Sequence, residues 1–382
     1  MNSQNRTTPE PRRPVLGQIL TGLSLLALSA SLLGAPFLRS DKITTVAGSG
    51  EASLGKRSGP ALKVNIGQPF GVEVGPAGGI YVTEVSNHRV LRLDPKSDSV
   101  ETVVGNGQKG HSGDGGKATE ASLNEPYEVR FDADGNMYVV EMVGAVIRKI
   151  DPAGTITTLA GTGEKGFSGD DGPALKAQFS QPHSIALDGK GGLYVADIGN
   201  HRIRRIDLES GFVTTFAGTG EKKLPRDGVV ATGEPMLGPR ALHIQGDTLW
   251  IALREGHSIW KMDLQTRTLR HVAGMGEKGF ADGQASRARF NGPKGIVAGR
   301  HNDVFVVDTE NQAIRRIDLE RAIVQTVAGA GPETRGFGGD GGLAIRGLMD
   351  RPHGITIDTA GSLYIGDTNN HRVRKVTFVV PK

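Results

Sequence analysis

The sequence predicts an all-β fold, a six-bladed β-propeller made of four-stranded antiparallel blades. Three observations support this prediction. One segment pattern occurs six times along the chain. Glycine accounts for 56 of the 382 residues, whereas aromatic residues make up only 5%, a balance typical of short strands joined by tight turns. The chain is also longer than the ~250–300 residues of a usual single core, so a repeated unit is expected.

Each repeat begins at a proline that is followed by a short apolar strand. The third repeat is the clearest, because residues 184–188, 192–197, 201–207 and 212–218 are apolar segments separated by turn residues. Four such antiparallel strands make one blade. The six prolines are Pro69, Pro126, Pro182, Pro239, Pro293 and Pro352, so the repeats are 54 to 59 residues apart. The predicted blades are 68–106, 125–163, 181–220, 238–276, 292–331 and 351–380.

The last repeat ends after its third strand, and a matching fourth strand occurs at the other end of the chain. Residues 42–48, Lys-Ile-Thr-Thr-Val-Ala-Gly, resemble the fourth strands at 213–218 and 324–329. We therefore expect residues 42–50 to complete blade six, so that a propeller over 42–380 leaves no open edge. Because the chain has no cysteine, this closure uses strand pairing and no disulfide.

The second and third strands carry a family resemblance. Residues 192–197 (Gly-Leu-Tyr-Val-Ala-Asp), followed by 199–207 (Gly-Asn-His-Arg-Ile-Arg-Arg-Ile-Asp), resemble the NHL repeat. The pattern recurs around Asn87-His88 and Asn370-His371, whereas repeats two, four and five differ at this turn. The resemblance implies a six-bladed NHL propeller of a bacterial, exported type. It is distantly similar to the peptidyl-hydroxyglycine amidating lyases and the gluconolactonase-like propellers.

The N-terminal segment predicts export. Residues 1–35 combine a polar start, Arg12-Arg13, and an uncharged apolar run over 15–35, as in a signal peptide or a membrane anchor. Residues 36–41 are interpreted as a linker. Cleavage and retention both stay open, so the expected location is periplasmic, secreted, or anchored to the outer side of the cytoplasmic membrane. A membrane contact is expected only through this segment.

Six side chains at one repeat position predict a binding site. Strand direction places the start of strand one, the turn between strands two and three, and the loop after strand four on the same face. The residue after each proline should line the mouth of the central channel there, and it varies between the repeats. The six are Phe70, Tyr127, His183, Arg240, Lys294 and His353. Cations and aromatic rings suit a small anionic or carbonyl-bearing ligand, although a merely hydrated polar mouth stays an alternative.

Two repeated acidic features are interpreted as architectural. The Gly-Asp loops at 110–116, 166–173 and 336–342 lack the alternating carboxylates of an EF-hand, so we expect their aspartates to bind turn donors. Their phenylalanines, Phe167 and Phe337 among them, are expected to pack between blades. The acidic residues that close strand two should cap the turn and pair with basic groups between blades. They are Glu84, Glu141, Asp197, Asp308 and Asp367.

A binding module for a small anionic ligand or a protein partner is therefore the first functional prediction. A metal-dependent lyase or a lactonase-like enzyme is the alternative. The family resemblance implies histidine ligands on alternate blades, but only His183 and His353 are present, and Arg240 and Lys294 nearby oppose a cation. We predict no cofactor, with zinc or calcium left as the alternatives. The net charge of +4, half of it in residues 1–41, gives no support for a nucleic-acid partner, and a monomer is expected.

Overall fold

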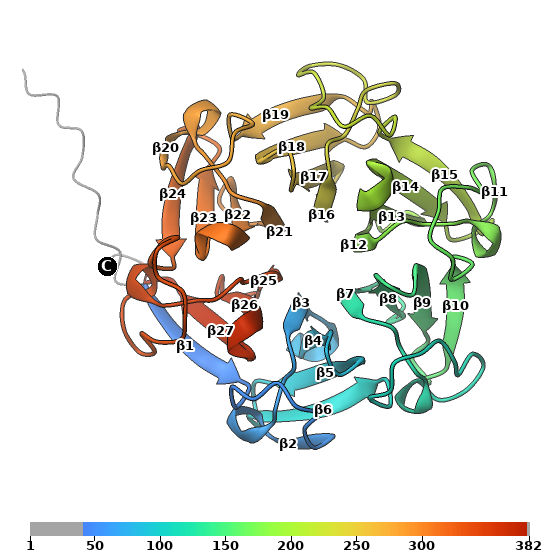
Figure 1. The fold of residues 1–382 in the computed structure, drawn as a ribbon, viewed down its shortest axis with the longest axis horizontal. Helices are drawn as coiled ribbons and strands as arrows, with labels where there is room; N and C mark the ends of the chain where they lie inside the picture. Colours follow the sequence, from blue (N-terminus) through green and yellow to red (C-terminus); the bar gives the residue numbers. More distant parts are fainter. Residues whose placement is uncertain (1–40, 380–382) are drawn as a thin grey trace, which may run out of the picture. The chain divides into compact units, whose positions relative to one another are not determined.

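Residues 41–379 are described by a computed structural model. Their strands form six antiparallel sheets around a ring, with the first strand of each blade innermost and the fourth outermost (Figure 1). The predicted fold class is confirmed. The expected signal or anchor at 1–35, nearly all of the linker and residue 380 lie outside the described residues. Within the described range, no helix is long and apolar enough to cross a membrane.

The blades follow one another along the chain. Blade one contains β3 (Pro69–Val74), β4 (Ile80–Glu84), β5 (Arg89–Asp94) and β6 (Ser99–Val104). Blade two contains β7 (Pro126–Phe131), β8 (Met137–Glu141), β9 (Val146–Ile150) and β10 (Ile156–Ala160). Blade three contains β12 (Pro182–Leu187), β13 (Gly192–Asp197), β14 (Arg202–Asp207) and β15 (Phe212–Ala217). Blade four contains β16 (Pro239–Gln245), β17 (Thr248–Leu253), β18 (Ser258–Asp263) and β19 (Leu269–Ala273). Blade five contains β21 (Pro293–Ala298), β22 (Asp303–Asp308), β23 (Ala313–Asp318) and β24 (Ile323–Ala328).

Blade six combines strands from both ends of the described chain. It contains β25 (Ile355–Ile357), β26 (Leu363–Asp367), β27 (Arg372–Thr377) and, at its outer edge, β1 (Lys42–Ala47). β1 pairs antiparallel with β27, with Ile43 opposite Val376. The backbone N–H of Val379 also donates to Oδ1 of Asp41 over 3.0 Å. The outer edge of β27 is therefore covered by the strand that precedes blade one.

The long loop after each fourth strand joins neighbouring blades at the rim. In the loop between blades two and three, Ala174 accepts a hydrogen bond from Gly161 at the end of blade two and donates one to Gly211 of blade three. Three loops add a short fifth strand at the edge of the following blade. These strands are β2 (Ser58–Pro60) on β6, β11 (Gly172–Pro173) on β15 and β20 (Gly283–Gln284) on β24. The four-stranded prediction thus underestimates these three sheets.

Short 3-10 helices occupy two kinds of position. One kind lies in the long loops: η1 (Ala61–Lys63), η3 (Ala118–Glu120), η4 (Ala174–Lys176), η6 (Ala285–Arg287) and η8 (Ala344–Arg346). The other forms the turn between strands two and three: η5 (Ile198–Asn200), η7 (Thr309–Asn311) and η9 (Thr368–Asn370). A further one, η2 (Pro76–Gly78), lies in the first hairpin of blade one. The alanine that starts each loop helix is buried, so each loop packs against the blades rather than lying free.

The hydrophobic core is a ring of interfaces between neighbouring blades. One cluster joins Tyr194 and Phe216 of blade three to Leu249 and Trp260 of blade four. Equivalent clusters occur at the other junctions, including the one where blade six meets blade one. Each fully buried large apolar side chain contributes about 1.5–3 kcal/mol. Stability is therefore distributed around the ring, and it depends on every pair of blades staying in contact.

A buried ion pair connects strands two and three in five of the blades. Successive residues on a strand face opposite sides, and Arg204 lies opposite Val195, two residues before Asp197 on the neighbouring strand. Arginine and carboxylate therefore share one face of one sheet. The pairs are Glu84–Arg89, Glu141–Arg148, Asp197–Arg204, Asp308–Arg315 and Asp367–Arg374. The expectation that these acids pair between blades is wrong, because the partner lies on the adjacent strand of the same blade.

The aspartates of the long loops bind the same arginines. Asp170 lies 2.7 Å from Arg204, and Asp114, Asp282 and Asp340 contact the arginines of blades two, five and six in the same way. Their principal partner is a guanidinium, in addition to turn donors. Phe167 is 43% exposed and lies under Arg202, with 3.9 Å from its ring centroid to the guanidinium carbon. The expectation that such phenylalanines pack between blades is therefore also wrong.

Histidines of the turn between strands two and three hold adjacent blades together. Nδ1 of His88 accepts a hydrogen bond from the backbone N–H of Glu125 at the start of blade two, over 3.2 Å. His201, His257 and His371 accept equivalent bonds of 3.1 to 3.2 Å from the next blade. In blade five, Oε1 of Gln312 accepts this bond instead, over 2.6 Å. Since a ring nitrogen accepts only without a proton, these contacts require neutral histidine.

These contacts predict acid-sensitive stability. Burial lowers the pKa of His88, His201 and His371 below the ordinary 6.5. The unfolded chain therefore binds protons first, so stability is complete above about pH 6.5 and falls as the pH drops toward the folded pKa. Glutamine already makes this contact at Gln312. If all three histidines are replaced by glutamine, we expect the free energy of unfolding to fall less between pH 7.5 and 5.5, by about 1 kcal/mol per contact. Urea unfolding midpoints measure this, and equal losses in both proteins would contradict it.

Candidate functional site

The central channel is closed by polar side chains about halfway along the innermost strands. The cavity between these strands is only about 10 Å³, enough for about one water molecule. Arg130 lies 3.1 Å from Glu128 and 3.5 Å from Glu73, and Ser184 donates to Glu128 over 2.7 Å. This network fills the axis with paired charges, so a ligand can only approach the mouth from outside.

Five of the six predicted mouth residues form one contiguous group. The ring of Phe70 stacks on His353 with 4.0 Å between centroids and lies 4.6 Å from Tyr127, which in turn is 4.9 Å from His183. The guanidinium carbon of Arg240 is 5.7 Å from the Tyr127 ring centroid. The structure therefore brings these residues together, but as a packed layer in which all except the half-buried Phe70 are buried.

Burial shifts the pKa values of the ionisable residues among the six predicted mouth residues. Burial and the charge of Arg240 lower the pKa of His183 well below its usual range. Burial and the charge of Lys294 lower the pKa of His353 in the same way. Burial lowers the pKa of Arg240 to about 10 and that of Lys294 to about 8. Near pH 7 the mouth therefore carries two cations beside two neutral histidines.

The backbone carbonyl two residues earlier orients the ring of each histidine. Nδ1 of His183 donates to the carbonyl of Gln181 over 2.6 Å, and Nδ1 of His353 donates to that of Arg351 over 2.8 Å. Among residues 41–379, no three His, Asp or Glu side chains are grouped to share a metal ion. The cations beside these histidines also oppose a divalent ion. These residues do not fit a zinc or calcium site, so we derive no metal-dependent step.

The open hollow on this face lies beside the axis rather than on it. A cavity of about 430 Å³ extends over blades four, five and six. Lys294 is the member of the predicted set that lines it. The lining residues are Arg254, Glu255, His257, Asn291, Gly292, Lys294, Glu310 and Arg351. The predicted mouth residues thus form the packed layer, whereas this hollow is where solvent and a ligand have access.

The hollow exists because two repeats lack a side chain that the others have. The residue before the strand-one proline is Gln68, Glu125, Gln181 or Arg351 in four blades, but glycine in blades four and five. A Cβ on Gly238 would lie 1.4 Å from Oε2 of Glu255, and one on Gly292 would lie 3.4 Å from Cγ of Glu310. The two glycines leave space that these acidic side chains enter. Comparing this position between repeats would have located the hollow from sequence.

The charges in the hollow converge on one carboxylate. Oε1 of Glu310 accepts hydrogen bonds from Nζ of Lys294 over 2.8 Å and from Nη2 of Arg351 over 2.9 Å. Arg335 lies 3.8 Å from the other oxygen. Arg254 pairs with Glu255 at the other side of the hollow. Three cations of different strands and loops are therefore directed at a single anion position.

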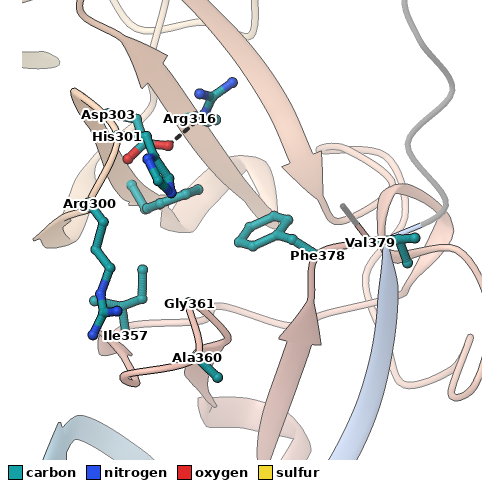
Figure 2. Close-up of a pocket in the computed structure, with 10 residues that line it drawn as sticks. Arg300, His301, Asp303, Arg316, Ile357, Ala360, Gly361, Phe378 and Val379 are labelled. Atoms are coloured by element: carbon teal, nitrogen blue, oxygen red, sulfur yellow. Dashed lines mark hydrogen bonds and ion pairs between the residues drawn. The ribbon is translucent and has the colours of Figure 1, made fainter. Parts of the chain in front are cut away.

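A second hollow lies on the opposite face, between the first hairpins of blades five and six. It measures about 350 Å³, and Figure 2 shows Arg300 and His301 on one side of it, with Phe378 on the other. Nε of Arg316 donates to Asp303 over 2.8 Å. The remaining oxygen of Asp303 lies over Gly299, where a Cβ would be 1.9 Å away. Because the hollow beside Lys294 brings three cations to one position, it is the better candidate for an anionic ligand.

Comparisons with known proteins identify the repeat. A family model described as NHL repeat matches residues 179–206 and 349–376. The six-bladed propeller therefore contains NHL repeats. A second model, described as Teneurin NHL domain, matches residues 76–166. This NHL-repeat propeller is 31% identical over 255 residues to SUPPRESSOR OF QUENCHING 1, a chloroplastic protein of Arabidopsis thaliana. The match covers 63% of the chain but only 24% of that relative.

Solved bacterial propellers share the fold of this NHL-repeat propeller. An auxiliary nutrient binding protein from Bacteroides thetaiotaomicron has a TM-score of 0.65 at 19% identity, covering 89% of this chain and 77% of that one. Virginiamycin B lyase from Staphylococcus aureus has a TM-score of 0.51 at 14% identity, covering 89% and 100%. At these identities the likeness shows the fold alone. A fold of this kind hosts many functions, so the function of this protein depends on its own residues.

Proposed function

We propose that this NHL-repeat propeller is an exported module that binds a small anionic ligand in the hollow over blades four to six. The observation that carries the proposal is the convergence of Lys294, Arg351 and Arg335 on one anion position inside a solvent-accessible cavity. A volume of about 430 Å³ lies within the ~300–1,000 Å³ of small-molecule sites. Charge-assisted bonds from such cations favour carboxylate and phosphate groups.

Electrostatics and repeat geometry both support this location. Lys294 has a pKa of about 8, so it carries most of its charge near pH 7. The hollow includes Gly292, one of the two positions that lack the long side chain, whereas the ion pairs inside the blades recur in five of the six blades. Because this hollow does not recur in every blade, the folding of the repeat does not account for it. The nutrient binding protein among the similar structures is consistent with a binding role for this architecture.

Refilling the hollow tests the proposal. Glutamine at position 292 restores the side chain of other repeats, and the backbone permits it because Gln68 and Gln181 both have φ 53° there, close to the 62° of Gly292. We expect Gly292→Gln to weaken binding of small carboxylates or phosphates at least about tenfold. Calorimetric titration with a panel of such anions measures this effect.

Two further variants serve as controls. Lys294→Met should weaken the same binding, because it removes a cation while keeping the length of the side chain. Arg300→Gln, which changes a residue of the second hollow (Figure 2), should leave binding unchanged. Anion binding that persists in Gly292→Gln but is lost in Arg300→Gln would move the site to the second hollow and contradict the proposal.

A further inference from the structure

The most informative contact in the hollow is made by Glu310. Its side chain is 29% exposed, whereas that of Lys294 is 8% exposed. One oxygen bridges Lys294 and Arg351 at 2.8 and 2.9 Å. Burial alone would raise the pKa of Glu310, but the hydrogen bond and charge of Lys294 and the charge of Arg351 hold it below the ordinary value. The carboxylate therefore stays ionised across the neutral range.

Glu310 is not part of the repeat. The equivalent turn position is Ser86, Val143, Gly199, Glu255 and Asn369 in the other blades. Asp308, two residues earlier, already pairs with Arg315 inside the blade. Asn311 donates to Asp308, and Gln312 accepts the bond from blade six. The turn thus has its full set of structural contacts without the Glu310 side chain.

From these contacts we infer that Glu310 occupies the anion position of the site, and that the ligand is a small carboxylate that displaces it from Lys294 and Arg351. This inference rests on the proposed function and adds the class of ligand. A carboxylate on a short aliphatic arm reproduces what Glu310 presents, one oxygen shared by an ammonium and a guanidinium. The side chain can leave because it is partly exposed and its backbone is held by other residues.

An internal carboxylate of this kind lowers apparent affinity. The ligand must first break two charge-assisted hydrogen bonds, and the two anions cannot occupy the same position. In return, Lys294, whose side chain is buried, is not left unpaired in the protein without ligand, which matters because an unpaired buried cation is costly. Removing Glu310 should therefore tighten binding, the opposite of what removing a contact residue does.

Propionate is a suitable probe because it is the side chain of glutamate without the backbone. We expect Glu310→Ala to bind propionate at least about tenfold more tightly than the unaltered protein, since the ligand no longer has to break two charge-assisted hydrogen bonds. Propionate should also raise the melting temperature of Glu310→Ala in a saturable way. Propanamide, which has the same shape without the charge, should do neither.

The controls separate this inference from the proposed function. Adding Lys294→Met to Glu310→Ala should abolish the gain, and Glu310→Gln, which keeps the size of the side chain, provides a second variant if the alanine variant does not fold. Equal propionate affinity in the unaltered protein, Glu310→Ala and Glu310→Gln would overturn the inference, while sensitivity to Gly292→Gln would still support the proposed function. A gain that survives Lys294→Met would also overturn it.

Discussion

Replacing Ile43 by aspartate is expected to open the ring at blade six and to destabilise the propeller by at least about 4 kcal/mol. Ile43 is completely buried in the cluster that joins blades five and six, and it pairs with Val376 of β27. The substitution removes a large apolar side chain and places a charge where it has no partner, and each change alone costs several kcal/mol. Chemical unfolding, followed by hydrogen exchange of β25 to β27, measures the effect.

Thr44→Asp is the matched control for this prediction. Thr44 lies next to Ile43 on β1, but it is half-buried and lies opposite Lys375 on β27. The same charge at this position should cost less than about 1 kcal/mol. If both variants unfold at similar denaturant concentrations, or if β27 keeps its protection in Ile43→Asp, then β1 does not secure blade six.

Replacing Arg204 by methionine should destabilise the protein by about 3–5 kcal/mol, the range for a buried ion pair that loses one partner. Arg204 is fully buried between Asp197 and Asp170 and also donates to the carbonyls of Ser168 and Gln178. Burial already raises the pKa of Asp197 to about 6, and without the guanidinium an uncompensated carboxylate would stay in the interior. Denaturation midpoints at pH 7.5 measure the loss.

The neighbouring residue provides the control. Arg205→Met changes the same residue type on the same strand, but Arg205 faces the other side of the sheet and is 27% exposed beside Asp207. Its loss should cost less than about 1 kcal/mol, as surface pairs do. Comparable losses for the two variants would mean that the buried pair contributes no more than a surface one.

Blade four shows that this ion pair is one of two solutions. At the positions of the acid and the arginine it has Leu253 and Trp260, which lie together in the cluster between blades three and four. The indole N–H donates to Ser258 over 2.9 Å, so no polar group of the pair is left without a partner. An apolar pair of suitable volume thus replaces the charges in the same fold, as expected where the desolvation cost of a buried pair offsets its attraction.

The fold was predictable from sequence because the repeat encodes it six times. The strands and their order follow from local patterns, and an error in one repeat is corrected by the other five. The proximity of the residues that follow the strand-one prolines was also accessible, since a fixed position in a repeated unit recurs at the same radius. Phe70, Tyr127 and His353 accordingly lie in contact.

The hollow and the ion-pair partners were not predicted, for physical reasons. The hollow depends on missing side chains, at Gly238 and Gly292. A missing side chain contributes no chemical group, so no motif in the sequence points to the cavity. The partner of Asp197 depends on the register of two strands, and a one-residue difference would place the arginine on the other face. Phe167 was assigned to the interior by its hydrophobicity, but it lies against a guanidinium at the surface.

The pairing of β1 with β27 has a consequence for how the molecule is assembled. Blades one to five are contiguous in sequence, so each can form from neighbouring hairpins, with loops that close at little entropic cost. Ile43 meets Val376 only after every blade between them is in place, so the two paired residues are separated by nearly the whole described chain. Ring closure is therefore the step that topology makes slowest. Until it occurs, β27 presents an unpaired edge, and β1, the first strand of the described chain, has no partner strand.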